Sequence, residues 1–471
     1  MDLKEQNIML KKIRTALAQS GIECGDVTLT KGPTVSLACI GSPAGLTLSR
    51  ARALEADICR SIGVSAARAV ETEDGFAYEI PNFRKDRVYP TLEEAFKIPG
   101  WSDGMELPLF LGYRADGTAV TLDLAKAPHL LIAGDPVQGK SVCLRALLSC
   151  LIEAKAPGDV KFLFGDPFIN FEEYRALDRN SFYGDGIVFT PSETISHLNA
   201  LGEEMDRRYG LLSGKRCSNI SEYREDGEKM PYIVVVIDEY GDYMSDCNPN
   251  KKAFETALIR IAQKGRAVGI HCVILTQRPD TCTMPCLIKV NFPTRLALRC
   301  STALNSRIIL DCEGAEKLIG RGDMLLLQDG ILTRLQGIYE DRKGTDRVIG
   351  KYNSMIPVCI PFGHDNQAAP ADDGIIVPAH PKRELQDIAA SEDFLAAAHW
   401  VVKNGRGSAI DLQRALYWGF RKATNIMDAL EEAGIVGPVR GRAPREVLAK
   451  DLDELKSIIS SISGKQSEEW E

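Results

Sequence analysis

A chain of 471 residues is long enough for two or three domains, each with a hydrophobic core of its own. The formal net charge of −8 argues against a protein coated with positive charge, although a channel for nucleic acid needs basic residues only locally. The 13 cysteines have no repeating spacing, which argues against a disulfide framework and favours a reducing cytoplasm. No apolar run reaches the length of a signal peptide or a membrane span, so we expect a cytoplasmic protein.

In chain order, the apolar pattern predicts a small α/β domain followed by a larger one. The first should contain a helix over Leu3–Gln19, a strand over Val35–Ile40 and a helix over Ser49–Ile62. Beyond it, apolar β segments alternate with helices, which is typical of a parallel sheet with crossovers. These β segments are His129–Ala133, Val160–Phe164, Tyr232–Ile237, Cys272–Leu275 and Arg295–Arg299. The predicted divisions are the small domain at 1–100, the large domain at 101–355, a Pro- and Gly-rich linker at 356–391, a helical domain at 392–450 and a polar acidic tail at 451–471.

A phosphate-binding motif follows the first of these strands. The segment Gly134–Ser141 fits the pattern G-x-x-x-x-G-K-[ST], between a strand and a helical run, as the motif requires. Lys140 is expected to reach the β and γ phosphates of ATP, and Ser141 to bind Mg²⁺. The predicted nucleotide-binding residues are Gly134, Asp135, Pro136, Val137, Gln138, Gly139, Lys140, Ser141 and Val142. The alternative is a Gly-rich turn that fits the pattern by chance.

An acidic pair ends the strand Ile233–Ile237, as the second half of an ATP site requires. Asp238 is predicted to hold the Mg²⁺ shell, and Glu239 to orient and polarise the attacking water. Such a pair alone is an ordinary solvated loop feature, but after a phosphate loop it indicates an ATPase. At the end of the next strand Gln277 is a candidate sensor of the γ-phosphate; the alternative is that Thr276 and Gln277 only cap the strand.

Several longer segments accompany these motifs in a definite order. They are His129–Gly134 leading into Gly139–Ser141, Ile237–Asp242, Ala262–His271, Thr276–Pro279, Leu287–Lys289, Pro293–Arg295, Ser306–Asp311 and Gly314–Glu316. From about Pro128 to Leu327 the chain resembles the FtsK/SpoIIIE family of DNA translocases. Gly32–Val35 with the following helix resembles the small N-terminal domain of that family, and Glu392–Lys450 resembles its C-terminal winged-helix domain.

The resemblance implies a RecA-like P-loop ATPase with a mostly parallel sheet, and a hexameric ring with double-stranded DNA in its channel and ATP between subunits. It implies that Arg266 is an arginine finger that reaches the ATP site of the neighbouring subunit. Arg278, Lys289 and Arg307 fall where the family places channel residues that contact the DNA backbone. DNA binding should therefore be insensitive to sequence and sensitive to salt. The alternative for each residue is a solvated surface charge.

The chain departs from the family pattern at several positions. Asp135–Gln138 replace the usual Thr-Thr-Gly-Ser, which adds an acid near the phosphates and predicts weaker nucleotide binding. Phe168 stands where a lysine is usual. Ala303 stands where a basic residue is common, which removes an expected DNA contact. We therefore expect the fold of the family to be retained more fully than its activity.

The C-terminal segment predicts a helix-turn-helix followed by a β wing over Val436–Val447. In the family this module reads short polar DNA sequences, and the matching positions here are Arg421, Asn425 and Asp428. Lys422 adds a candidate phosphate contact. Because these residues differ from the usual Asn, Arg and Glu, we expect the sequence preference to differ or to be lost. The alternative is a winged helix that mediates protein contacts.

Bacterial members of the family usually carry membrane-spanning helices ahead of the N-terminal domain, and this sequence shows none. One interpretation is a soluble paralogue from a plasmid, phage or conjugative element; another is an anchor on a separate membrane or recombinase partner. The leading functional hypothesis is an ATP-dependent translocase of double-stranded DNA. The second is a coupling ATPase that delivers DNA or protein to a conjugation or secretion channel. The third is a DNA-binding scaffold that uses ATP only for assembly.

Overall fold

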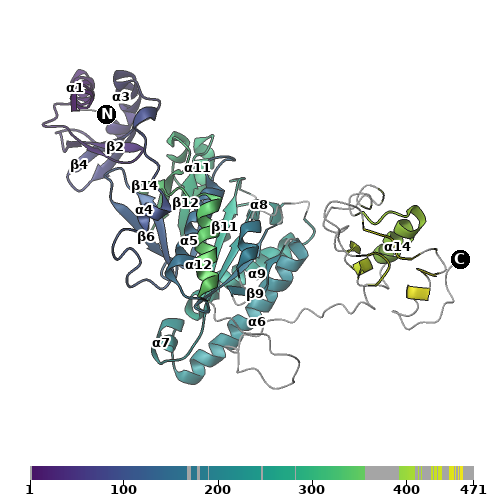
Figure 1. Cartoon of the computed structure of the whole chain (residues 1–471). Coiled ribbons are helices and arrows are strands. Elements are labelled where there is room, and N and C mark those ends of the chain that lie inside the picture. Colours follow the sequence, from purple (N-terminus) through teal and green to yellow (C-terminus); the bar gives the residue numbers. More distant parts are fainter. Residues whose placement is uncertain are drawn as a thin grey trace. The chain divides into compact units, whose positions relative to one another are not determined.

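A computed structural model describes the protein over residues 3–166, 171–177, 181–188, 190–245, 248–281, 283–355 and 392–408, and over single residues and short stretches between 412 and 459. Residue contacts divide the chain into two compact units, Met1–Val377 and Pro378–Glu471. The first unit contains two separate sheets, and the sequence predicted a small and a large α/β domain in this part of the chain (Figure 1).

The N-terminal domain is built on a four-stranded antiparallel sheet in the order β1-β2-β4-β3. Its strands are β1 (Thr28–Lys31), β2 (Val35–Gly41), β3 (Arg68–Thr72) and β4 (Gly75–Pro81), and its helices are α1 (Leu3–Gln19), α2 (Leu48–Ala53) and α3 (Glu55–Ile62). Figure 1 shows α1 and α3 over one face of this sheet. Alternate residues of β2 and the apolar stripe of α1, with Ile13 and Leu17 fully buried, form a core of the domain's own.

The sequence prediction was right about α1 and β2 but wrong about one helix. The expected single helix over Ser49–Ile62 is broken at Leu54 into α2 and α3. The Leu54 N–H donates to the Ala51 carbonyl, three residues back, at 3.2 Å. This tighter turn ends α2, and the Glu55 carboxylate at the start of α3 accepts a hydrogen bond from the Ala69 N–H at 2.9 Å.

The large domain contains a ten-stranded sheet in the order β6-β5-β14-β13-β12-β7-β11-β10-β8-β9. Its strands are β5 (Pro108–Tyr113), β6 (Ala119–Asp123), β7 (His129–Ala133), β8 (Val160–Gly165), β9 (Phe182–Val188), β10 (Tyr232–Ile237), β11 (Ile270–Thr276), β12 (Thr294–Leu298), β13 (Asp323–Gln328) and β14 (Ile331–Gly337). All pairings from β12 to β9 are parallel, which confirms the predicted β segments. The remaining strands extend the sheet by antiparallel pairing, which the sequence pattern did not predict.

Helices connect and cover the parallel strands. They are α4 (Leu92–Ala95), α5 (Lys140–Ala154), α6 (Pro191–Lys215), α7 (Ile220–Glu225), α8 (Tyr240–Tyr243), α9 (Lys251–Lys264), α10 (Cys286–Asn291), α11 (Ala303–Leu310) and α12 (Arg342–Ser354), with short 3₁₀ turns at Arg84–Asp86, Glu172–Ala176, Gly265–Val268 and Ala315–Lys317. The crossover through α5 runs along the sheet in one direction, and those through α6 and α9 run back in the other. Because such crossovers are right-handed, α5 covers one face and α6 with α9 covers the opposite face. α12 packs on α5.

The parallel register brings three chain segments to one edge of the sheet. Strand β11 lies between β7 and β10, with Thr276 paired with Ala133 and Ile274 with Ile237. The residues that follow these strands therefore lie side by side at the carboxyl edge. In open α/β sheets this edge is where ligands bind.

The second unit is described in part. Helix α14 (Glu392–Asn404) contributes Phe394 and Val401 to a small core that also contains Leu412, Leu430 and Ile435. Single antiparallel bridges join Gly407 to Arg445 and Val436 to Val447. The second bridge agrees with the predicted β wing over Val436–Val447.

Two buried histidines lie side by side in the parallel sheet. His129 of β7 accepts a hydrogen bond at Nδ1 from the Cys272 N–H, at 3.0 Å, so its Nε2 donates to the Ala262 carbonyl at 2.9 Å. His271 of β11 lies 2.9 Å from the Pro128 carbonyl through Nδ1, and both rings are fully buried. Burial lowers the pKa of His129 to about 3 and that of His271 to about 4. Both rings are therefore neutral in the folded protein.

The neutral pair predicts a loss of stability in acid. A buried neutral histidine contributes its full stability above the unfolded pKa of 6.5, and this contribution falls as the pH drops toward the folded pKa. The variant His271→Asn lacks one such group. The difference in unfolding free energy between the wild type and this variant should shrink by about 1 kcal/mol between pH 7.5 and pH 5.5. Urea unfolding at the two pH values measures it, and a constant difference would contradict the assignment.

Candidate functional site

The phosphate loop joins β7 to α5, as the sequence predicted. Gly139 caps the helix with a φ of 107°, in the left-handed region, and a Cβ on it would meet the Gly322 nitrogen at 3.2 Å. Only glycine fits this position without strain. Val137, at the loop tip, has a φ of 64° and is 97% exposed. The loop therefore leaves the N-terminus of α5 open to an anionic ligand.

Lys140 lies at the centre of the loop and is 7% exposed. Its ammonium donates to the carbonyls of Gly134 and Asp135, at 2.7 and 2.6 Å. Burial lowers the pKa of Lys140, and the nearby carboxylates of Glu239, Asp135 and Asp238 oppose this effect. The predicted lysine and the predicted acids are thus brought together, and the loop can hold positive charge where phosphate would bind.

Glu239 is held by the end of the neighbouring strand. It is 6% exposed, and its backbone is left-handed with a φ of 43°. Its carboxylate accepts hydrogen bonds from the Thr276 hydroxyl at 3.1 Å and from the Gln277 N–H at 3.1 Å. From the sequence Thr276 was considered only as a possible strand cap, but its hydroxyl makes it a positioning residue for Glu239. The Gln277 side chain is exposed, and its role as a sensor stays a prediction.

Ser141 and Asp238, the predicted magnesium ligands, line one narrow cleft. Hydroxyl and carboxylate oxygens are the ligands that Mg²⁺ prefers. The cleft is also lined by Arg145, one turn after Ser141 on α5, and by Glu173. These two form an ion pair at 3.1 Å, with the Glu173 side chain 7% exposed. Arg145 and Glu173 were missed from the sequence because neither belongs to a motif.

A cavity of about 470 Å³ lies beside the loop. Its walls are mainly aromatic and aliphatic, and they come from four segments of the chain; they include Tyr89, Val137, Val142, Met324, Ile338 and Tyr339. The cavity adjoins the start of α5, so a nucleotide with its phosphates in the loop could place its base here. Of the lining residues, only Val137, Gly139 and Val142 were predicted at this site, because most of the others are distant from the motif in sequence.

Arg266 lies far from the phosphate loop of its own chain. It is exposed on the 3₁₀ turn that precedes β11, at the amino edge of the parallel sheet. Strand β11 has seven residues, so the two edges are about 20 Å apart at about 3.3 Å per residue. An arginine at this edge cannot reach the loop at the other edge of the same subunit. It is accessible to a second molecule.

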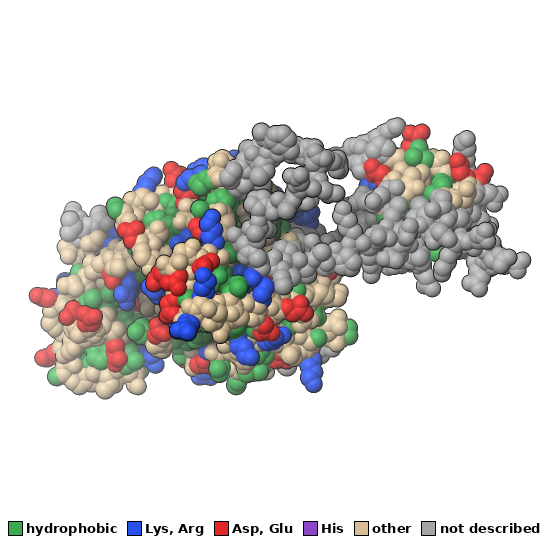
Figure 2. All heavy atoms as spheres, turned by 90° about the horizontal axis from the view of Figure 1, so that it is seen from below, with side chains coloured by type: hydrophobic (Ala, Val, Ile, Leu, Met, Phe, Trp, Pro, Cys, Tyr) green, Lys and Arg blue, Asp and Glu red, His purple; other side chains and the backbone are tan. Residues whose placement is uncertain are grey.

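The three predicted channel residues of the large domain all have acidic partners. Arg278 lies 3.7 Å from Asp242 and its side chain is 65% exposed. Arg307 pairs with Glu313 and its side chain is 59% exposed. Lys289 bonds to Asp311 with its side chain only 19% exposed, so it is the least accessible of the three. On the face that Figure 2 presents, basic and acidic side chains are interspersed.

Asp135, the unusual acid of the phosphate loop, is tied to the loop after β12. Its carboxylate accepts a hydrogen bond from the Ser301 hydroxyl, and its N–H donates to the Arg299 carbonyl at 3.0 Å. The segment after β12 leads directly into α11, which carries Arg307 and Ala303. The substitution that departs from the family pattern is thus accommodated by a contact outside the loop.

The DNA-reading candidates Arg421, Lys422 and Asn425 lie outside the described residues, as does Asp428. In the described part of the same module, Arg445 pairs with Glu431 at 2.7 Å and donates to the Met427 carbonyl at 2.9 Å. Arg445 therefore holds the module together.

Comparisons with known families match both parts of the chain. The profile of the FtsK/SpoIIIE family matches residues 92–281, and that of the Ftsk gamma domain matches residues 390–450. The chain belongs to the FtsK/SpoIIIE family. The predicted family and the predicted P-loop α/β fold are thereby confirmed. Among the residues that the structure describes, no helix is both long enough and apolar enough to cross a bilayer.

Two members of the family are similar over most of this chain. DNA translocase FtsK from Treponema pallidum is 33% identical over 433 residues, which cover 89% of this chain and 52% of that protein. DNA translocase SftA from Bacillus subtilis is 31% identical, over 93% of this chain and 45% of that protein. The chain spans about half the length of the curated relatives it matches.

Among solved structures, the pCW3 conjugation coupling protein TcpA with ATPγS has a TM-score of 0.52 and 21% identity, over 73% of this chain and 99% of that one. At this level of identity the similarity concerns the fold alone.

The contact between Thr276 and Glu239 can be tested by a near-isosteric change. Thr276→Val removes the hydroxyl donor and should lower the rate of ATP turnover about tenfold, because a misplaced Glu239 orients water less well. Nucleotide affinity should change less than about twofold, since the phosphate loop is untouched. Thr276→Ser keeps the donor and should retain turnover. Steady-state hydrolysis and equilibrium binding measure the two effects; loss of affinity without loss of turnover would refute the assigned role.

Proposed function

We propose that the protein is an ATP-dependent translocase of double-stranded DNA that works as a ring of identical subunits. The observation that carries this proposal is the convergence of Lys140, Asp238 and Glu239 at the carboxyl edge of the parallel strands β7 and β10, which flank β11. Membership of the FtsK/SpoIIIE family, and relatives that are named DNA translocases, support the choice of DNA as substrate.

In the proposed reaction, the backbone N–H groups of the loop and the N-terminus of α5 attract the phosphates of ATP. The Lys140 ammonium exchanges its two loop carbonyls for phosphate oxygens. Ser141 and Asp238 are the residues that would hold Mg²⁺, which when bound neutralises phosphate charge. Glu239, fixed by Thr276, orients the attacking water.

The ring is proposed because Arg266 and the phosphate loop lie at opposite edges of the sheet. As an arginine finger, Arg266 must therefore act on the ATP site of a neighbouring subunit. There its guanidinium would stabilise charge on the transferred phosphoryl group. A hexamer is the ring that the family resemblance implies.

DNA is proposed to contact the ring through phosphate contacts, from Arg278 and Arg307 and to a smaller extent from Lys289. The C-terminal module would add contacts from Arg421, Lys422 and Asn425. The ten cysteines in the described part of the chain are free, which supports a cytoplasmic site of action.

The function is tested by ATP turnover under three conditions: with no addition, with duplex DNA and with a DNA-free partner extract. A translocase should be stimulated by duplex DNA and should displace a triplex-forming strand, and Lys140→Ala should abolish both activities. DNA stimulation should weaken as salt rises. Stimulation by the extract alone would favour a coupling ATPase for conjugation or secretion. Nucleotide binding without turnover would favour a scaffold that uses ATP only for assembly.

The position of Arg266 predicts complementation between inactive subunits. Arg266→Ala and Lys140→Ala should each reduce turnover by about a hundredfold or more. In a 1:1 mixture, some interfaces combine an intact Lys140 from one subunit with an intact Arg266 from the next, so turnover should recover in part. Lys264→Ala, also exposed near that edge, is the control and should leave turnover unchanged. A mixture no more active than its components would contradict action between subunits.

A further inference from the structure

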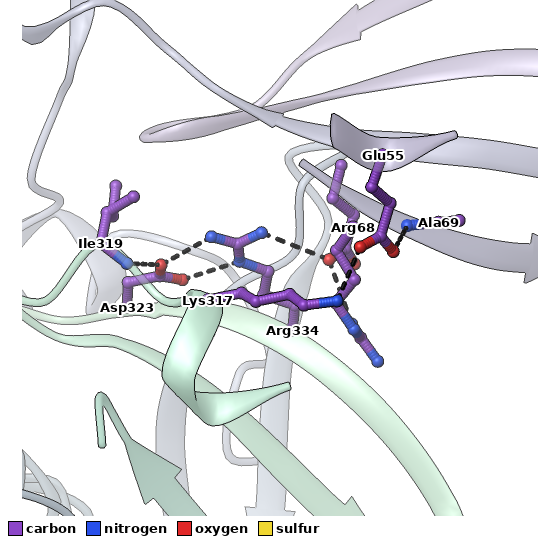
Figure 3. A network of polar contacts seen from close by, with 8 residues as sticks. Glu55, Arg68, Ala69, Lys317, Ile319, Asp323 and Arg334 are labelled. Carbon is purple, nitrogen blue, oxygen red and sulfur yellow. Dashed lines mark hydrogen bonds and ion pairs between the residues drawn. The ribbon is translucent and has the colours of Figure 1, made fainter. Parts of the chain in front are cut away.

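The N-terminal domain meets the large domain through a buried network of ion pairs (Figure 3). The Arg334 guanidinium of β14 donates to the two oxygens of Asp323 at 3.0 and 2.7 Å, and its side chain is 3% exposed. It also lies 3.4 Å from Glu79 of β4, which pairs with Arg68 at 3.0 Å. Because a buried charge is tolerated only when paired, these contacts hold the small domain at a defined place on β14.

A second buried contact joins the two domains nearby. The hydroxyl of Thr34, in the segment between β1 and β2, donates to the Gln336 side-chain oxygen at 2.7 Å. Thr34 is fully buried and Gln336 is 4% exposed. The amide nitrogen of Gln336 donates in turn to the Arg321 carbonyl at 3.0 Å. Thr34 belongs to the Gly32–Val35 segment, for which the sequence suggested no chemistry.

Both contacts lead to one turn, residues 319–323, between the 3₁₀ turn at Ala315–Lys317 and β13. At one end the Asp323 carboxylate accepts a hydrogen bond from the Ile319 N–H at 2.7 Å, and this contact is drawn in Figure 3. In the middle, the backbone of Arg321 has a φ of 56°, a conformation that residues other than glycine rarely adopt. Such a turn keeps its shape only when its surroundings hold it, as Asp323 and Gln336 do here.

The turn lies directly against the phosphate loop. The Gly322 N–H donates to the Gln138 carbonyl at 3.2 Å, one residue before the helix cap. A Cβ on Gly320 would lie 2.5 Å from the Gln138 side-chain oxygen, so the two segments are in close contact. A shift of the turn would therefore move the backbone that has to receive phosphate.

We propose that the N-terminal domain sets the conformation of the phosphate loop through turn 319–323, with Thr34 and Gln336 as positioning residues. The proposal rests on the nucleotide site proposed above. Domain docking and nucleotide binding are then coupled, and the coupling is reciprocal: docking favours binding, and bound nucleotide tightens docking. This gives the small domain a role in the ATPase cycle although it contributes no residue to the catalytic edge.

Calorimetric titration of the whole chain with ADP and Mg²⁺ tests the proposal. Thr34→Val removes only the hydroxyl donor and should weaken ADP binding about five- to tenfold. Gln336→Met, which loses the side-chain hydrogen bonds to Thr34, Arg321 and Gly337, should weaken binding at least as much. Thr34→Ser keeps the donor and should bind ADP like the wild type.

The matched control is Tyr78→Phe, which also deletes one buried hydroxyl hydrogen bond of the same domain. Tyr78 donates to the Ala51 carbonyl at 2.9 Å within the core of the domain, so this variant should lose stability but bind ADP within about twofold of the wild type. Hydrogen exchange supplies a readout that a merely structural role would not move. ADP should slow exchange in β2 and β4 of the wild type, and much less in Thr34→Val.

Two results would overturn the proposal while leaving the nucleotide site intact. One is that the wild type binds ADP measurably and the Thr34→Val variant binds it just as tightly. The other is an equal loss of affinity in Thr34→Val and Tyr78→Phe, which would reflect general loosening of the domain. A wild-type chain that binds no ADP at all would reject the proposed function itself, and this inference with it.

Discussion

The ammonium group of Lys140 imposes the main constraint on this protein. A lysine side chain that is only 7% exposed stays charged only when oxygen atoms surround it. Loop carbonyls supply the direct contacts, and acids at the end of β10 supply the surrounding negative charge. β10, which ends in these acids, is separated from β7, which precedes the loop, by the single strand β11. The parallel register is therefore as necessary to the site as the motif itself.

The same constraint explains why parts outside the motifs matter. Glu239 depends on the end of β11, where Thr276 donates its hydroxyl. The phosphate loop in turn lies against turn 319–323, and that turn is held from the N-terminal domain. The carboxyl edge is thus supported by three elements. β11 and turn 319–323 follow the phosphate loop in the sequence, and the N-terminal domain precedes it by about a hundred residues. A site built in this way responds to changes in domain packing.

The features predicted from sequence were those whose residues are neighbours in the chain. A phosphate loop needs a strand, a loop and a helix in succession, so Gly134–Ser141 identified it without a structure. The parallel strands were also recognisable, because each is a continuous apolar run buried on both faces. The placement of Asp238 and Glu239 near Lys140 then followed from the rule for carboxyl edges.

The features that sequence did not reveal depend on contacts between distant residues. Thr34 and Gln336 are 302 positions apart, and neither carries a motif. Tyr89 and Tyr339 line the same cavity although they are far apart in the sequence. The antiparallel strands β13 and β14 extend the sheet beyond the crossover pattern, which gave no sign of them. The break at Leu54 is equally invisible in the apolar spacing, since both of its halves keep a helical period.

The position of Arg266 at the amino edge of the sheet has a consequence for symmetry. If one surface of a protomer supplies the guanidinium and a separate surface on the opposite side receives it, the contact is heterologous. Each added copy then offers the same unsatisfied surface as the last one. Such contacts end in a closed ring only when the rotation per copy divides a full turn, and otherwise they continue as a helical filament.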